Sequence, residues 1–459
     1  MSVQGTAAAP ALLWAPAAWV GGRWQAGVLL RAGADGLWAE VRAGVAAPPG
    51  AEVLPGPVLP SLVNAHSHAF QRAFVGLAER RDSAHDDFWS WRDRMYGVAL
   101  RITPAQLRAL AAQLYAELLD GGYTQVCEFH YLQHAPDGSR YADPAAMLQA
   151  LADAAAEVGI GLTLLPVLYE RAGFTQPALR DDQRRFATSA DEVLALQRAA
   201  AGMGALVTAG VAVHSLRAAR PASIVALAER SSGPLHVHVA EQTAEVDDCL
   251  AATGCRPIDW LARHAPLDAR WQLVHATHSV PGEIAAVARA GAGVVLCPGT
   301  EANLGDGLAD LPGWLAAGVP LSVGSDSQVL RAWPEELRWL EYGQRLALRQ
   351  RNVAADPGHE PATAARLFER VRAGGAAAAG LPRWGLEPGA RADLLLLDAS
   401  CPGLAGLPAS HLLDGLVFAA AARPFARVLV AGRWRWPDDA AVAARAGRAA
   451  AVMHQLWAQ

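Results

Sequence analysis

The chain has 459 residues, of which 52% are hydrophobic, and its formal net charge is −5. This length and apolar content are sufficient for one large core and a smaller second core. The weak negative charge argues against a protein that binds nucleic acid or an acidic membrane through its overall field, and no uncharged apolar stretch is long enough to predict a membrane helix.

All 39 lysine-or-arginine positions are arginine. The lack of lysine excludes a Walker-type phosphate loop, Schiff-base chemistry and a carboxylated lysine that bridges two metals. The five cysteines are widely spaced and form no CxxC pair, so neither a disulfide framework nor a structural zinc knot is indicated. These thiols, together with an apolar N-terminus that has no basic leader, predict a reducing, cytoplasmic location.

Both ends of the chain show the pattern of short β-strands. Apolar runs at residues 11–14, 24–30 and 36–41 are separated by glycine and proline, and similar runs occur at 392–398 and 426–432. We therefore expect residues 1–60 and 376–459 to combine into one small β-rich domain.

The middle of the chain, residues 61–375, alternates apolar strands with helical stretches. Thr103 and Ser189 each precede a helical stretch, with Gln106 and Glu192 three residues later, which is the pattern of a capping box. Repeated βα units with buried strands predict a parallel barrel, and an open doubly wound sheet is the alternative. The eight predicted strands are residues 61–68, 124–131, 161–168, 207–214, 235–240, 271–275, 293–297 and 320–325.

Polar residues fall at or just beyond the ends of these strands. Catalytic groups of a (β/α) barrel gather at the carboxyl ends of its strands, so these residues are candidates for one site. They are His66, His68, Tyr131, His214, Arg217, His238, Glu241, His275 and Asp326.

A metal site is the most direct prediction from these residues. His66 and His68 are two apart, so in a strand their imidazoles share one face. With His238 and Asp326 they would supply three nitrogens and one oxygen to a zinc-like ion that keeps a position for water. His236 shares the face of His238, but we expect it to pack lower in the barrel.

Two further residues are predicted to handle protons. Glu241 follows the expected ligand His238 by three positions and is a candidate general acid/base. His275 ends the sixth predicted strand, which favours an active-site role over a structural one. His130 alternates to the face opposite Tyr131, and we expect it to be structural.

Several sequence segments around these candidate residues resemble those of a known family. The segment 64–72, Asn-Ala-His-Ser-His-Ala-Phe-Gln-Arg, resembles the first metal motif of the amidohydrolase superfamily, and the chain from about 60 to 352 looks most like the formimidoylglutamate deiminases within it. The other matching segments are 88–92, 128–131, 214–217, 238–242, 274–278, 297–307, 324–327 and 334–342. The loop at 328–333 departs from the pattern of this family.

The resemblance implies a fold and a set of roles. The implied fold is α/β, a (β/α)8 TIM barrel with a small β-sandwich domain built from both termini. The implied cofactor is one divalent ion, most simply zinc, although iron or manganese also suit such ligands. The metal ligands would be His66, His68, His238 and Asp326, the catalytic residues Glu241, His275 and Asp326, and the substrate contacts Gln71, Arg92, Tyr131, His214 and Arg217.

The implied reaction is hydrolytic deimination of N-formimino-L-glutamate to N-formyl-L-glutamate and ammonia, a step of histidine degradation. Arg92 and Arg217 would each fork onto a carboxylate of this substrate. A deaminase of a purine or pyrimidine on the same scaffold is the enzymatic alternative, and a barrel that has lost catalysis is the non-enzymatic one. We expect a small-molecule dicarboxylate as partner, no nucleic acid or membrane, and, from the superfamily, a homodimer.

Overall fold

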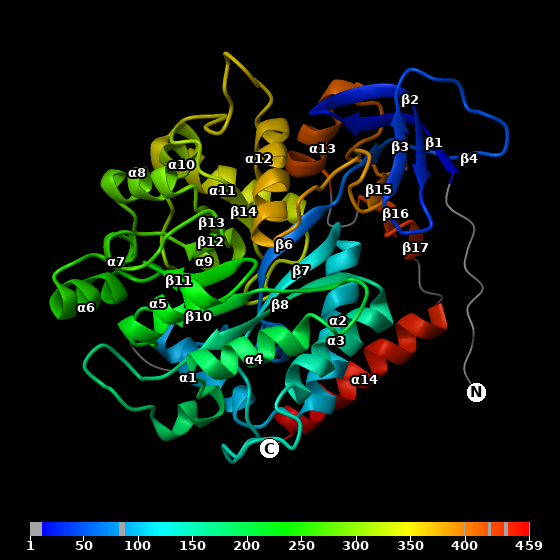
Figure 1. Cartoon of the computed structure of the whole chain (residues 1–459). Helices are drawn as coiled ribbons and strands as arrows, with labels where there is room; N and C mark the ends of the chain where they lie inside the picture. Colours follow the sequence, from blue (N-terminus) through cyan, green and yellow to red (C-terminus); the bar gives the residue numbers. More distant parts are fainter. Residues whose placement is uncertain (1–11, 82–87, 399, 421–423, 436–438, 459) are drawn as a thin grey trace.

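The computed structural model describes residues 12–81, 88–398, 400–420, 424–435 and 439–458. It contains a nine-stranded sheet formed by the middle of the chain and an eight-stranded sheet formed by the two ends. Figure 1 shows the barrel and its surrounding helices with the terminal sheet packed beside them. None of the described helices combines the length and apolar character needed to cross a bilayer.

The predicted parallel barrel is confirmed. Its strands follow one another in chain order around the sheet, and all adjacent pairs are parallel. The first strand and the segment that follows the last strand meet at a parallel bridge between Ser67 and Asp326. The strands on this path are β6 (Leu62–Ser67), β7 (Tyr123–His130), β8 (Gly161–Leu168), β10 (Val211–Ser215), β11 (Leu235–Val239), β12 (Trp271–His275), β13 (Gly293–Leu296) and β14 (Leu321–Val323).

The predicted fourth strand, residues 207–214, is two strands in the structure. β9 (Val207–Ala209) pairs with β8 but is not one of the eight consecutive barrel strands, and β10 begins after Gly210. A Cβ at Gly210 would stand 2.3 Å from the carbonyl oxygen of Pro234. The chain therefore bends where only glycine fits, a feature that apolar periodicity does not reveal.

Helices connect and cover the barrel strands. The predicted capping boxes are confirmed at Thr103 and Ser189, which begin α2 and α4. The helices are α1 (Phe88–Ala99), α2 (Pro104–Asp120), α3 (Ala146–Val158), α4 (Ala190–Ala200), α5 (Pro221–Arg230), α6 (Thr243–Thr253), α7 (Pro257–His264), α8 (Pro281–Ala290), α9 (Pro298–Leu304), α10 (Leu311–Ala316), α11 (Trp333–Leu348), α12 (Thr363–Ala378), α13 (Leu412–Phe418) and α14 (Asp439–Trp457), and the 3₁₀ turns are η1 (Ala69–Phe74), η2 (Asp181–Phe186) and η3 (Ala409–His411).

The C-terminal end of α12 packs into the barrel interior. Ala378 clusters with Ala65, Val274 and Val295, which are residues of three barrel strands. A Cβ at Gly374 would stand only 2.0 Å from the carbonyl oxygen of Leu321, so glycine allows the helix to approach the strands this closely. The barrel interior is thus a packed core rather than a channel.

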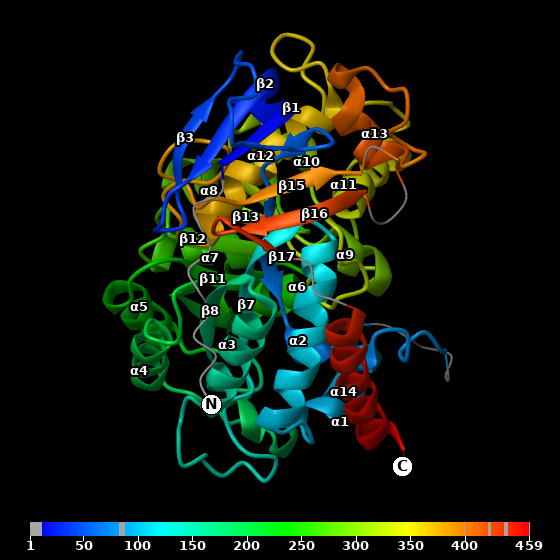
Figure 2. The ribbon, with the colours of Figure 1, turned by 90° about the vertical axis from the view of Figure 1, so that its right-hand side faces the viewer.

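The two ends of the chain share one sheet, as predicted. The C-terminal strands β17, β16 and β15 lie side by side, and the antiparallel pair of β15 with β5 joins them to the N-terminal strands. Figure 2 shows the whole sheet on one side of the barrel. Residue 11, the start of the first predicted strand, lies outside the described residues. The strands are β1 (Leu12–Val20), β2 (Arg23–Ala32), β3 (Trp38–Arg42), β4 (Glu52–Val53), β5 (Val58–Leu59), β15 (Leu394–Leu397), β16 (Phe425–Val430) and β17 (Arg433–Arg435).

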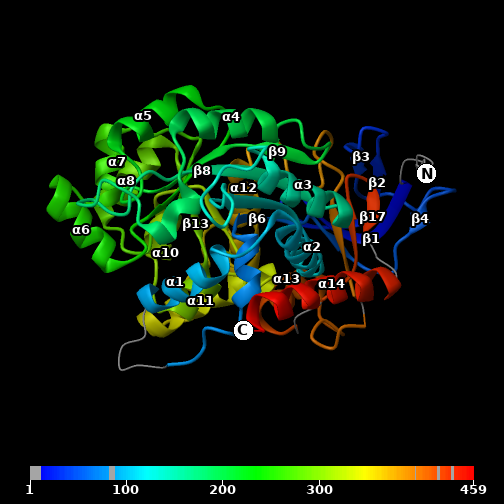
Figure 3. The ribbon, with the colours of Figure 1, turned by 90° about the horizontal axis from the view of Figure 1, so that it is seen from below.

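The C-terminal part of the chain is divided between the barrel and the terminal sheet. The predicted boundary between residues 375 and 376 falls inside α12, whose end packs into the barrel. The last helix, α14, lies along α2 on the outside of the barrel, which Figure 3 shows. The indole nitrogen of Trp457 donates a hydrogen bond to the carbonyl oxygen of Ala73 at 2.7 Å. Residues 439–457 therefore belong structurally with the barrel.

Candidate active site

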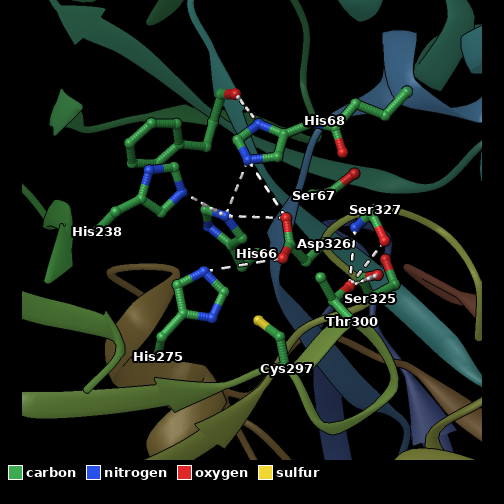
Figure 4. Close-up of polar contacts among 12 residues, drawn as sticks. His66, Ser67, His68, His238, His275, Cys297, Thr300, Ser325, Asp326 and Ser327 are labelled. Atoms are coloured by element: carbon green, nitrogen blue, oxygen red, sulfur yellow. Dashed lines mark hydrogen bonds and ion pairs between the residues drawn. The ribbon is translucent and has the colours of Figure 1, made fainter. Parts of the chain in front are cut away.

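Three predicted histidines converge at one end of the barrel. His66 lies in β6, His68 one residue beyond it, and His238 in β11. The Nε2 atom of His66 is 3.1 Å from Nε2 of His68 and 2.9 Å from Nε2 of His238. Figure 4 shows the three rings turned toward one another, and together they form a group that could hold a metal ion.

The chemistry of these rings suits metal binding. His68 Nδ1 lies 2.7 Å from the carbonyl oxygen of Phe129. Because only a protonated nitrogen can bond that oxygen, Nε2 keeps its lone pair. Burial lowers the pKa of His66, His68 and His238, which keeps the rings neutral. Nitrogens held about 2.0–2.1 Å from one tetrahedral zinc ion stand roughly 3.3 Å apart, close to the observed separations.

Asp326 adds a carboxylate to this cluster. Its Oδ1 atom is 3.6 Å from His66 Nε2 and 3.4 Å from His68 Nε2, whereas Oδ2 is 3.8 Å from His275 Nε2. The backbone of Asp326 is fixed to β6, since its amide donates to the carbonyl of His66 and its carbonyl accepts from the amide of His68. One oxygen thus faces His66 and His68, and the other faces His275.

The loop after β14 is built to hold this arrangement. The side-chain oxygen of Asn64 accepts a 2.9 Å hydrogen bond from the amide of Ser325. Gln328, in the loop that is unfamiliar by sequence, is fully buried and donates to Ser67 Oγ and to the carbonyl of Asp326. Asp326 and Gln328 have φ angles of 46° and 72°. Such left-handed backbone in non-glycine residues is strained and is concentrated at functional sites.

His275 lies among three carboxylates. Its Nε2 is 3.6 Å from Glu241 Oε1 and its Nδ1 is 3.3 Å from Glu301 Oε1. Burial alone would lower the pKa of His275, but Glu241, Glu301 and Asp326 outweigh it and raise the pKa well above its usual value. Burial also raises the pKa of Glu241 to about 7, although His275 opposes this. A charged imidazole and a carboxyl that exchanges protons near neutral pH therefore face each other.

A pocket of about 650 Å³, partly open to solvent, leads to these groups. It is also lined by two arginines, Arg92 from α1 and Arg217 from the segment after β10. The Nε atoms of both are buried and have no hydrogen-bond partner among the described residues. The guanidinium carbon of Arg92 stands 4.6 Å from the ring centre of Trp89, and that of Arg217 stands 5.7 Å from it. One indole thus brings two like-charged side chains together.

The other predicted substrate contacts also line this pocket. Gln71 Nε2 donates to the hydroxyl of Tyr131 at 3.3 Å, and the Oε1 atom of Gln71 is buried with no partner among the described residues. The ring of His214 packs 5.4 Å from Tyr131 and 4.5 Å from Tyr169, centre to centre. The pocket is therefore lined by every predicted site residue except His66, which is fully buried beneath it against His68 and His238.

Two acidic residues were missed by sequence reasoning. Glu301 holds Nδ1 of His275 and also accepts from the amide of Cys297 at 2.9 Å. Glu128 accepts from Ser67 Oγ and from the amide of Ala69, and burial raises its pKa to about 7. Both lie inside segments that matched the family. The available signal was an acidic residue within an apolar strand or at a strand end.

Two histidines lie away from the cluster, as expected. His236 Nε2 bonds the carbonyl of Ala378 at 2.8 Å, on the side of α12. His130 bonds the carbonyl of Leu132 at 2.9 Å and is fully buried. These contacts support structural roles.

A parallel barrel with imidazoles and a carboxylate at the carboxyl ends of its strands defines the class of metal-dependent hydrolases. A model of the amidohydrolase family matches residues 58–435. The chain therefore belongs to the amidohydrolase family.

Individual relatives give more detail. The chain is 48% identical over 415 residues to a formimidoylglutamate deiminase from Pseudomonas aeruginosa, covering 90% of this chain and 91% of that protein. A crystal structure of an amidohydrolase from Brucella melitensis has a TM-score of 0.89 at 39% identity, covering 97% and 99%. An adenosine deaminase from Xanthomonas campestris with bound zinc has a TM-score of 0.78 at 23% identity, covering 98% of each chain, and shares the fold.

Proposed function

We propose that this enzyme hydrolyses N-formimino-L-glutamate to N-formyl-L-glutamate and ammonia, a step of histidine degradation. The proposal is carried by two arginines that line the same pocket as His68 and Asp326 and whose buried Nε atoms have no partner among the described residues. Buried guanidinium groups bind carboxylates in a forked geometry. The relative that is 48% identical acts, by its name, on formimidoylglutamate.

The proposed ligands of a single zinc ion are His66, His68, His238 and Asp326, because their donor atoms converge and three are neutral nitrogens. A bound zinc ion lowers the pKa of its water toward about 7 and so supplies hydroxide at neutral pH. Asp326 can bind through Oδ1 and leave Oδ2 facing His275. Oδ2 is thus positioned to take the proton from the attacking water.

Glu241 and His275 are the other proposed catalytic residues. In our proposal Glu241 holds the formimino nitrogen and passes it the proton it needs to leave as ammonia, a role suited to a carboxyl whose pKa burial raises to about 7. His275 carries positive charge next to Asp326 and stabilises the negative charge that develops as the formimino carbon is attacked.

The remaining pocket residues are proposed to bind the two carboxylates of the substrate. Arg92 and Arg217 pair with the carboxylate farther from the formimino group. Gln71, Tyr131 and His214 form a neutral wall between the arginines and the metal ligands and donate hydrogen bonds to the other carboxylate.

Ammonia release tests this function. Zinc-loaded enzyme is offered N-formimino-L-glutamate, N-formimino-L-aspartate, guanine and adenosine in parallel, before and after chelation. We expect ammonia chiefly from N-formimino-L-glutamate, with loss on chelation and recovery when zinc is added. Ammonia from guanine or adenosine instead would support a heterocycle deaminase and overturn the proposal, as would no ammonia from any of the four.

Two further expectations stay proposals. We propose a cytoplasmic location, supported by five cysteines that are all free and buried, as thiols are in reducing compartments. The homodimer expected from the superfamily is likewise proposed, and light scattering of the purified enzyme tests it.

A further inference from the structure

A second group of potential metal ligands lies behind the proposed catalytic centre. It consists of His275 at the end of β12, Cys297 directly after β13, and Glu301 in α9. One donor atom from each lies within 4.8 Å of the other two, and all three residues are buried. Figure 4 shows the sulfur of Cys297 facing the imidazole of His275.

This group is distinct from the histidine cluster because it uses the other nitrogen of His275. Nε2 of His275 faces Asp326 and Glu241, whereas Nδ1 lies 3.3 Å from Glu301 Oε1. Donors about 2.0–2.1 Å from a tetrahedral ion are separated by roughly 3.3 Å, so this nitrogen and oxygen already have a suitable spacing. The proposed reaction gives no role to the thiol of Cys297.

The donor types favour particular ions. A sulfur, an imidazole nitrogen and a carboxylate oxygen together suit zinc or the softer cadmium, whereas magnesium and calcium prefer oxygen alone. The catalytic cluster offers three nitrogens and an oxygen but no sulfur. A thiophilic cation would therefore distinguish the two sites.

We propose that His275, Cys297 and Glu301 form a second, inhibitory site for a thiophilic divalent cation, with water or the second Glu301 oxygen as fourth ligand. Binding releases the thiol proton of Cys297 and the Nδ1 proton of His275 to solvent, because both ligands bind in their deprotonated forms. The ion replaces the Nδ1–H that Glu301 now holds. The bound ring is a neutral imidazole, so the positive charge that the proposed reaction places beside Asp326 is lost and turnover falls.

Cadmium titration of the zinc-loaded holoenzyme tests this proposal. We expect one cadmium to bind per chain with the original zinc retained, as measured by elemental analysis. A sulfur-to-cadmium charge-transfer band should grow in the ultraviolet, saturate at one equivalent, and parallel the loss of turnover. Loss of zinc in step with cadmium uptake, without this band, would show replacement at the catalytic site and overturn the proposal.

Cysteine variants identify the ligand. Cys297→Ser should lose the band and weaken cadmium binding at the second site by more than the roughly 10–100-fold that loss of an outer-sphere partner costs, while its zinc content stays unchanged. Cys127→Ser is the matched control, because Cys127 is equally buried but contacts the carbonyl of Ala378 instead. A band that persists in Cys297→Ser would refute the assignment. Cys297→Ala serves the same purpose if the serine variant folds poorly.

Discussion

Gly324 lies at the catalytic end of the barrel, directly against the backbone of His66. A Cβ atom built there would stand 2.6 Å from Cβ of His66 and 2.8 Å from its backbone nitrogen and oxygen. These neighbours are backbone atoms of β6 or are attached rigidly to them, so they cannot rotate away. We therefore predict that Gly324→Ala displaces His66.

The size of the effect follows from the contact. To reach the 3.4 Å of an ordinary contact, His66 must move by roughly 0.8 Å, whereas metal–ligand distances tolerate only about ±0.2 Å. Disturbing the support of a ligand costs about 10–100-fold in metal affinity, or about 1.4–2.8 kcal/mol. Overpacking should also lower the free energy of unfolding by about 1–3 kcal/mol.

Zinc affinity is measured by competition with a chromophoric chelator, and unfolding of the metal-free protein by urea. Gly282→Ala is the matched control, because a Cβ at Gly282, in α8, would meet nothing within 4 Å. Wild-type zinc affinity in Gly324→Ala would show that the site does not depend on this contact and would refute the reasoning.

Three further predictions concern the acid/base groups and the arginines. Glu241→Gln should lower kcat by about 10²–10⁴-fold with zinc content unchanged; full turnover would exclude the proton-transfer role. Arg217→Ala should raise KM by about 10–150-fold, which corresponds to the loss of a charge-assisted hydrogen bond of about 1.5–3 kcal/mol. Replacing the exposed Arg230 by alanine should leave KM unchanged. An unchanged KM in Arg217→Ala would rule out the contact. Burial lowers the pKa of His130 to about 3, so below pH 6.5 the unfolded chain binds a proton that the folded chain does not, and stability present above pH 6.5 is lost as the pH falls. His130→Gln should remove about 2 kcal/mol of the stability lost between pH 6.5 and 5, measured by urea unfolding with the exposed His359→Gln as control; equal losses in both variants would contradict this.

Much of the barrel could be predicted from the sequence because its strands are buried on both faces. Such strands appear as short continuous apolar runs, and two predicted runs, at 161–168 and 271–275, match β8 and β12 residue for residue. The starts of α2 and α4 could also be predicted, because the residues of each capping box lie within three positions of Thr103 or Ser189. The break at Gly210 could not be predicted in this way, because the carbonyl that excludes a side chain there belongs to Pro234, which lies just before β11.

The candidate site was predictable to the extent that its residues are adjacent to strand ends. His66 and His68 are two apart, so period-two geometry alone places both imidazoles on one face. Arg92 had no such signal, because it lies on α1 and reaches the pocket only through the packing of Trp89 and Tyr96 against it. Its selection depended on the resemblance to a family.

The sequence by itself determined the parallel barrel, the terminal β-rich pairing and the residue types of a zinc-like site, since strand burial, helix capping and ligand chemistry act over a few neighbouring positions. Only the tertiary structure decided which nitrogen of each histidine faces the cluster, the left-handed backbone at Asp326 and the contact between Glu301 and His275. The physical reason is that closing the sheet brings β14 against β6. Distances across that closure depend on the packing of the whole barrel and on no single segment.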